Sequence, residues 1–330
     1  MKGVMFSFII VLIALALMSL IAVQKSLVSF YGEKLAIETR VNSMNSLYDS
    51  IVTDSGKALG IIAKRAASAA DSFVITNGRG LPEANQTLLE LIVNGTLNNT
   101  AEILMEDTTI VDWKNKMEDV GSLSGFNTNI TILELKIMPY DSWNILSTIY
   151  LSISLADKNR VASLDRNATV SQPVSIEGLE DPLVPLNTLG RATNVIVRSP
   201  YWGNFTQNLG GGNWDIENLK KDIENSYYHP STKGASFLDR LEGKPEVQSK
   251  YRSQTTETIG LESFVNKGYF SAVGISVDIE KTNVDHLYFS GDPHPGKKVR
   301  GLETTSFRID SELCGNQNHT DIYGVSELLV

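Results

Sequence analysis

The 330-residue chain has little cysteine and little histidine, and both shortages exclude classes of protein. Cys314 is the only cysteine, so the chain has no internal disulfide framework and no zinc site built on paired cysteines. The four histidines stand singly, and none has the i, i+4 spacing of a helical pair of metal ligands; they are His229, His286, His294 and His319. The sequence therefore predicts no metal and no cofactor.

An excess of positive charge is also absent. The 29 Lys and Arg residues are outnumbered by 38 Asp and Glu residues, which gives a net charge of −9. A nucleic-acid-binding protein normally carries a basic face, so we expect no nucleic-acid partner. The 42% hydrophobic and 20% charged residues are typical of a chain that folds, and they exclude a disordered or collagen-like protein.

One long apolar run is present, and no second run approaches its length. Residues Val4–Val23 carry no charge, and as a helix they would extend about 30 Å, the thickness of a hydrocarbon core. Lys2 precedes the run, which favours an N-terminus in the cytoplasm and a single-pass protein with its C-terminal domain outside the cell. The alternative is a secretory signal cleaved after Ala16, but the run continues well past that point. Its length favours an anchor that is uncleaved or only trimmed at its N-terminus.

Proline is absent before Pro82, so the segment after the apolar run is free to continue as a helix. Apolar residues from Ile37 to Ile51 recur in steps of three and four, which predicts one helical stripe. Asp54-Ser55-Gly56 predicts a break and a new N-cap. The alanine-rich stretch Gly56–Ala70 suits close packing, either of a stalk helix on its own domain, which we favour, or of one copy on another.

Beyond the helix the pattern predicts a sheet. Short helices are expected at Ala84–Val93 and Thr109–Val120. Alternating residues then predict an antiparallel meander with strands near 129–137, 149–155 and 161–176, the last broken by Pro173. The C-terminal part of the long helix is the nearest element that could cover the apolar face of this sheet.

The remaining residues predict turns and further strands. A polar helix is expected near 216–226, and strands are expected at Ala272–Ile279, Val284–Phe289, Lys298–Leu302 and Ser306–Ile309. The fold class is therefore α+β: a long N-terminal transmembrane and stalk helix, an antiparallel β meander and a second β-rich unit. The expected domains are the anchor (1–25), the stalk helix (26–76), the α+β domain with the meander (77–190), a turn-rich connector (191–245) and a β-rich C-terminal domain (246–330).

Seven Asn-x-Ser/Thr sequences are candidate N-glycosylation sites, and all follow the apolar run, as an outward-facing domain requires. They begin at Asn85, Asn94, Asn98, Asn129, Asn167, Asn204 and Asn318. Cys314 and His319 could form a thiol–imidazole pair, but their polar surroundings predict a loop and an incidental thiol. No catalytic residue is therefore predicted, and the chain is not expected to be an enzyme.

The first residues carry a resemblance. Met1-Lys2-Gly3 followed directly by the apolar run resembles the class III signal of archaeal type IV pilin-like proteins. The resemblance implies that a prepilin peptidase cuts the bond Gly3–Val4 and leaves the apolar helix on the mature protein. Pilins usually carry Glu at the fifth mature position, where this chain has Phe8, and this departure favours a minor subunit over a major one. Residues 174–183 and 236–243 resemble an uncharacterised group of archaeal surface proteins, which implies a surface location and no activity.

Three functions follow as expectations. The first is a pilin-like, extracytoplasmic surface protein with a structural or adhesive role, whose partners are the membrane, further copies of itself or other pilin-like subunits. The second is a signal-anchored binding or sensor ectodomain that enters no filament. The third, an anchored surface enzyme, has the least support because the sequence shows no nucleophile, metal site or paired acids.

Overall fold

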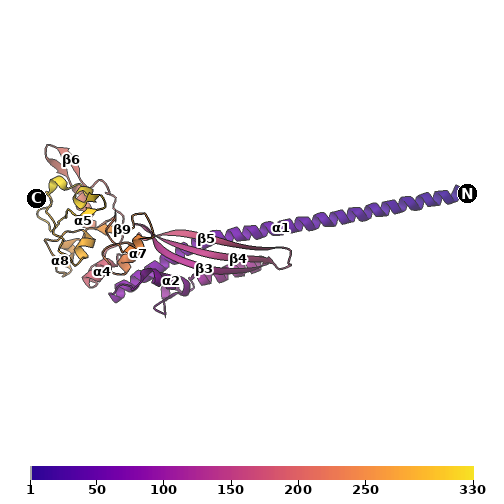
Figure 1. The fold of residues 1–330 in the computed structure, drawn as a ribbon, viewed down its shortest axis with the longest axis horizontal. Helices are drawn as coiled ribbons and strands as arrows, with labels where there is room; N and C mark the ends of the chain where they lie inside the picture. The colour runs from indigo at the N-terminus through magenta and orange to yellow at the C-terminus, as the bar shows by residue number, and fades with distance from the viewer. Residues whose placement is uncertain (1) are drawn as a thin grey trace. The chain divides into compact units, whose positions relative to one another are not determined.

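The computed structural model describes the backbone of residues 2–330 and the side chains from Phe8 onward. Its longest element is α1 (Lys2–Asn77), one uninterrupted helix of 76 residues (Figure 1). The break expected at Asp54-Ser55-Gly56 is therefore wrong. Ser55 is fully buried, and a Cβ added to Gly56 would lie 3.3 Å from Val170 Cγ1. Close packing against strand β5 (Ser163–Ser175) thus holds the helix together where local propensity would end it.

α1 changes character along its length. Its large apolar side chains from Phe8 to Leu35 are exposed, whereas further along Met44 and Ile51 are buried. The alanine-rich stretch is also buried, with Ala63, Ala66, Ala67, Ala69 and Ala70 at most 1% exposed. The C-terminal half of the helix is therefore packed inside its own protein, and the N-terminal part is bare.

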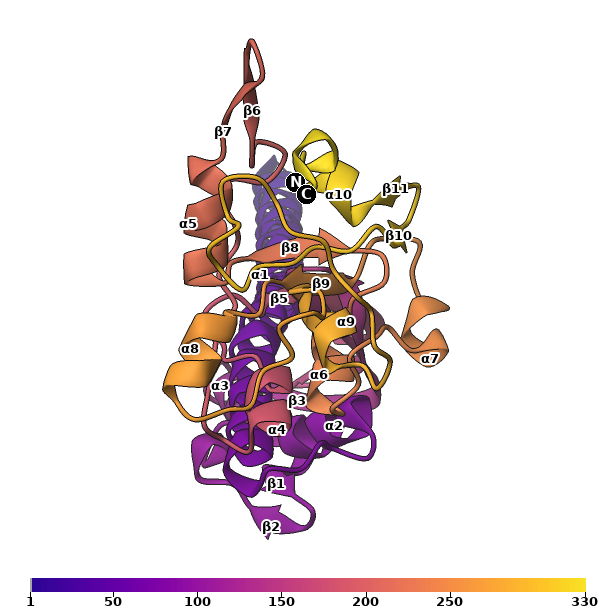
Figure 2. The ribbon, with the colours of Figure 1, turned by 90° about the vertical axis from the view of Figure 1, so that its left-hand side faces the viewer.

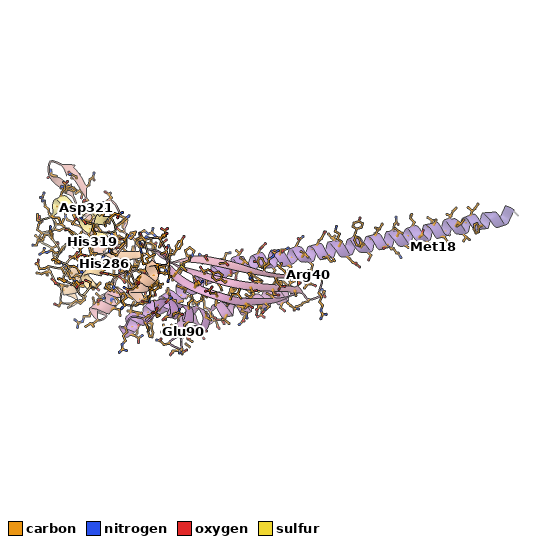
Figure 3. The ribbon with its side chains drawn as sticks, viewed as in Figure 1. Met18, Arg40, Glu90, His286, His319 and Asp321 are labelled. Carbon is orange, nitrogen blue, oxygen red and sulfur yellow. The ribbon has the colours of Figure 1, made fainter. Side chains whose placement is uncertain are left out.

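The chain divides into two compact units. The first contains the residues up to Asp54, Lys114–Ile132 and Leu151–Ala168; the second contains Ser55–Trp113, Leu133–Tyr150 and Thr169–Val330. In the first unit, Arg40 joins α1 to later segments. Arg40 is labelled in Figure 3. Its Nε lies 2.5 Å from Asp157 Oδ1, its Nη2 donates to the Gly125 carbonyl, and its guanidinium lies over the Phe126 ring.

Two predicted helices and the meander are confirmed. α2 (Ala84–Asn94) ends at Gly95, which has a left-handed backbone. The hairpin β1 (Thr96–Leu97) and β2 (Thr100–Ala101), the short helix η1 (Ile103–Met105) and α3 (Ile110–Leu123) follow. β3 (Phe126–Asp141), β4 (Asn144–Asp157) and β5 then form a sheet in the order β3-β4-β5 (Figure 1). β5 continues through Pro173, contrary to the expected break, because an edge strand tolerates a missing donor.

The C-terminal half has short elements only. They are α4 (Leu183–Thr188), β6 (Gln207–Gly210), β7 (Asn213–Asp215), α5 (Glu217–Asn225), β8 (Tyr228–Ser231), α6 (Phe237–Leu241), α7 (Ser249–Arg252), β9 (Gly260–Ser263), α8 (Lys267–Ala272), α9 (Asp285–Phe289), β10 (Leu313–Cys314), β11 (Gln317–Asn318), α10 (His319–Ile322) and η2 (Ser326–Leu328). Two-stranded ribbons pair β6 with β7, β8 with β9 and β10 with β11.

The strands expected in the second β-rich unit are therefore wrong for the most part. Residues 285–289 form the helix α9, and residues 273–279 are irregular. The segments near 298 and 308 make single bridges, Lys297 with Ile309 and Val299 with Leu329. The core of this region holds it together without a large sheet. Its buried members are Phe205, Ile216, Leu219, Phe264, Val284, Leu287, Val299, Leu302, Phe307, Ile309, Tyr323, Val325 and Leu328.

α1 also carries a buried carboxyl group, Asp71, which is 5% exposed and whose Oδ1 has no hydrogen-bond partner among the described residues. Burial, together with the nearby carboxyls of Asp181 and Glu180, raises the pKa of Asp71 to about 8, against the opposing charge of Lys64. Asp71 is thus protonated in the folded protein at neutral pH. In the unfolded chain it ionises near its ordinary pKa of about 4.

We expect Asp71→Asn to flatten the pH dependence of stability. The folded-state pKa lies above the unfolded one, so the contribution of Asp71 is fully present below about pH 4 and is lost as the pH rises to about 8. Asparagine stays neutral throughout. Between pH 5 and pH 8 the variant should therefore gain at least about 1 kcal/mol relative to the wild type, the equivalent of one pKa unit. Denaturant unfolding at both pH values measures this, and a difference that does not change with pH would refute it.

Candidate functional site

The candidate site is a group of buried polar side chains around strand β9. β8 and β9 pair antiparallel, which places His229 opposite Glu262 (Figure 2). α9 supplies His286 and α10 supplies His319, whose side chains are labelled in Figure 3. Glu262, His286 and His319 are each 1% exposed, so the group lies within the protein.

Glu262 is the common neighbour in this group. The Tyr323 hydroxyl donates to its Oε1. Its Oε2 lies 3.9 Å from His286 Nδ1 and 3.6 Å from His319 Nε2. Both separations are too long for hydrogen bonds. One carboxylate oxygen therefore faces two imidazole nitrogens without bonding to either.

His319 is held by a second carboxylate. Its Nδ1 lies 2.7 Å from Asp310 Oδ1, and the Thr282 hydroxyl donates to Asp310 Oδ2 at 2.7 Å. This chain of contacts fixes the plane of the ring and turns Nε2 towards Glu262. His319 Nε2 itself has no hydrogen-bond partner among the described residues.

His286 is the least satisfied of the three side chains. Neither of its ring nitrogens has a hydrogen-bond partner among the described residues. Its Nδ1 lies 3.7 Å from Oδ1 of Asp285, an oxygen that accepts instead from the His286 backbone N–H. A buried polar atom without a partner costs about 1–3 kcal/mol, so these nitrogens need an explanation.

Cys314 and His229 flank the group. Cys314 is 8% exposed and lies in β10, where its Sγ is 3.3 Å from the Ser231 hydroxyl and 3.8 Å from Glu262 Oε2. The expected polar loop is thus wrong. His229 Nε2 lies 3.0 Å from Asp222 Oδ2, and its ring stacks on Trp202.

The charges of the group balance one another. Burial lowers the pKa of His319, but Asp310, Cys314 and Glu262 together raise it to about 12. Burial raises the pKa of Cys314, but the contact with His319 lowers it, and the result is about 7. Burial also opposes the ionisation of Glu262, yet its pKa is lowered, chiefly by His319. The folded site therefore holds a carboxylate beside an imidazolium at neutral pH.

A buried arginine, Arg240, bonds to the segments that carry the site residues. Arg240 Nη1 lies 2.5 Å from Asp181 Oδ2, and its Nη2 lies 2.9 Å from Asp285 Oδ2 and donates to the Leu261 carbonyl. Arg240 Nε donates to the Ala235 carbonyl. Because Leu261 and Asp285 adjoin Glu262 and His286, this network positions the segments that carry both side chains.

The processing and glycosylation sites predicted from the sequence lie outside the buried group around β9. Gly3 and Val4 are within α1, but their side chains are outside the described residues. Asn94, Asn98, Asn129, Asn167 and Asn204 are exposed, whereas Asn85 and Asn318 are half-buried. His294 bonds to Glu312 and takes no part in the buried group. The buried group leaves no signal in the sequence, because its members are far apart in the chain and follow no ligand spacing.

Two kinds of chemistry fit the buried group. Cys314, His319 and Asp310 have the order of a thiol–imidazole–carboxylate relay. The Glu262 carboxylate beside Sγ raises the pKa of Cys314, although the other contacts lower it to about 7. Such a relay uses neither Glu262 Oε2 nor His286. A Glu with two His is a ligand set for zinc or non-haem iron. Only the second chemistry gives a role to Glu262 Oε2 and to His286.

Comparisons of the chain with protein-family models, with curated proteins and with solved structures gave no match.

Proposed function

We propose that this chain is a single-span, pilin-like surface protein with a structural or adhesive role, held in the membrane by the first part of α1. The observation that carries the proposal is the contrast along one helix between bare and buried apolar side chains. From Phe8 to Val23, twelve large apolar side chains are about half exposed or more: Phe8, Ile9, Ile10, Val11, Leu12, Ile13, Leu15, Leu17, Met18, Leu20, Ile21 and Val23 (Met18 is labelled in Figure 3).

Full burial of one such side chain is worth about 1.5–3 kcal/mol. Covering the exposed parts of twelve of them is therefore worth on the order of 10 kcal/mol, as much as the stability of a whole domain. The helix contains an 18-residue window of mean hydropathy 2.4 with none of its residues buried, which suits a lipid bilayer. Phe30 and Tyr31, both exposed, follow the run where aromatic side chains favour the membrane surface.

Two further features support the proposal of a pilin-like protein. A long helix whose first part is bare and whose second part packs into a domain with an antiparallel sheet is the architecture that the resemblance at Lys2-Gly3 implies. Five candidate glycosylation sites are exposed, as an outward-facing domain requires. Phe8 supplies no carboxylate to pair with a neighbouring N-terminus, so we expect assembly into few copies, as in a minor subunit.

The test is the N-terminus of the native protein. The proposal expects a mature chain that begins at Val4, because cutting Gly3–Val4 keeps the whole apolar run. The measurement is N-terminal sequencing and peptide mass of protein purified from its native membrane. A Gly3→Leu variant serves as the control, since a bulky side chain at the cut bond should leave Met1 in place.

Two outcomes would contradict the proposal. Met1 as the first residue of the wild type would indicate a plain signal anchor and favour the second function, a surface binding or sensor ectodomain outside any filament. Leu17 as the first residue would show a cleaved secretory signal and no anchor.

A further inference from the structure

The buried group around β9 contains three potential ligand atoms that lie within 4.8 Å of one another, one each from Glu262, His286 and His319. Bonds of about 2.0–2.2 Å to a zinc ion place neighbouring ligand atoms about 3.3–3.6 Å apart. The separations from Glu262 Oε2 to the two imidazole nitrogens, 3.6 Å and 3.9 Å, exceed that spacing by a few tenths of an ångström at most. The two imidazole nitrogens lie within 4.8 Å of each other, so side-chain rotations would have to draw all three atoms towards the ion.

From this geometry we propose that Glu262, His286 and His319 form a binding site for a divalent transition-metal ion, with zinc the best match. The atoms that would bind the ion are those that the protein leaves without partners. His319 Nε2 and His286 Nδ1, the two imidazole nitrogens that face Glu262 Oε2, have no hydrogen-bond partner among the described residues. Buried polar atoms are nearly always satisfied. A metal ion would displace the proton that His319 Nε2 carries and would satisfy an imidazole and a carboxylate oxygen at once.

The surroundings are those of a metal-binding histidine. Ligating histidines commonly bond through their second ring nitrogen to a carboxylate, which fixes the tautomer and the orientation of the ring. His319 does so through Nδ1 and Asp310 Oδ1, and Thr282 holds the far oxygen of Asp310. Tyr323 donates to Oε1 of Glu262, and Oε2, which accepts only a long contact of 3.8 Å from Cys314 Sγ, faces the two imidazoles.

An ion bound at this site would join separate parts of the fold. Its ligands come from β9, α9 and α10, elements of four or five residues each. Such short elements have little stability of their own. A metal ion bound by all three would join segments that lie up to 57 positions apart, and its binding free energy would become folding free energy.

The experiment uses the full chain in detergent micelles, purified with a tag that contains no histidine. Zinc content by mass spectrometry should be one ion per chain. Thermal unfolding followed by circular dichroism, with and without a chelator, should show the melting temperature falling on zinc removal by about 5–10 °C, the shift expected for a ligand present at a hundredfold excess over its Kd. A folded wild-type protein that takes up no zinc would overturn the proposal.

Variants locate the ion. His286→Ala should lose both the bound zinc and the chelator-dependent shift, whereas His294→Ala, which removes a histidine outside the group, should keep both. Zinc retained in full by a folded His286→Ala protein would overturn the proposal.

X-ray absorption at the zinc edge of the wild type gives an answer that needs no variant to fold. We expect nitrogen and oxygen neighbours with the multiple-scattering pattern of two imidazoles. A pattern with no imidazole, or with one only, would overturn the site.

Discussion

Replacing Arg240 by methionine should cost about 3–5 kcal/mol of the free energy of unfolding, the usual penalty for removing one partner of a buried ion pair. The guanidinium is fully buried between two carboxylates, Asp181 and Asp285, and it also bonds to the Ala235 and Leu261 carbonyls. Methionine fills a similar volume but leaves both carboxylates without their counter-charge. Since a domain is commonly stable by only about 5–15 kcal/mol, this loss would remove a large share of the stability of the C-terminal half of the chain.

The matched control is Lys220→Ala. Lys220 pairs with Glu217 at 3.7 Å, and both side chains are well exposed, so its loss should cost less than about 1 kcal/mol. Urea unfolding of the purified chain, followed by tyrosine and tryptophan fluorescence, measures both variants. An Arg240→Met protein within about 1 kcal/mol of the wild type would show that the buried network does not support this region.

The first half of the fold could be predicted from local pattern because its elements are long and regular. The heptad-like steps from Ile37 to Ile51 predicted α1, and alternation predicted the three strands β3, β4 and β5. The predicted break at Asp54-Ser55-Gly56 failed for a tertiary reason. Gly56 and Gly60 lie against β5, where a side chain would approach Val170 and Gln172 closely. The two glycines therefore serve packing and do not end the helix.

The second half was predicted poorly because its order comes from packing between distant segments. Val273, Ile275 and Val277 alternate as a strand would, but they pack as an irregular segment beside Val184, Ala192, Val265 and Phe270. Residues 285–289 form a short helix, and a segment this short is too brief for its periodicity to distinguish a helix from a strand.

No local sequence pattern could predict the candidate site. Glu262, His286 and His319 are separated by 24 and 33 positions, and no two of them share a secondary-structure element. Sequence periodicity reports neighbours three or four residues apart on a helix or two apart on a strand. Only the pairing of β8 with β9, and the placement of α9 and α10 beside them, brings these side chains together.

The proposal of an anchored protein whose domain faces outwards can be tested with a single introduced cysteine. Leu123 is 90% exposed, whereas the one native cysteine, Cys314, is 8% exposed and should react little in the folded protein. In a Leu123→Cys variant, a membrane-impermeant maleimide should label intact cells as fully as lysed cells, because the new thiol lies outside the membrane. The wild-type chain gives the background from Cys314. Labelling of Leu123→Cys that appears only after lysis would place the domain in the cytoplasm and contradict the proposed anchoring.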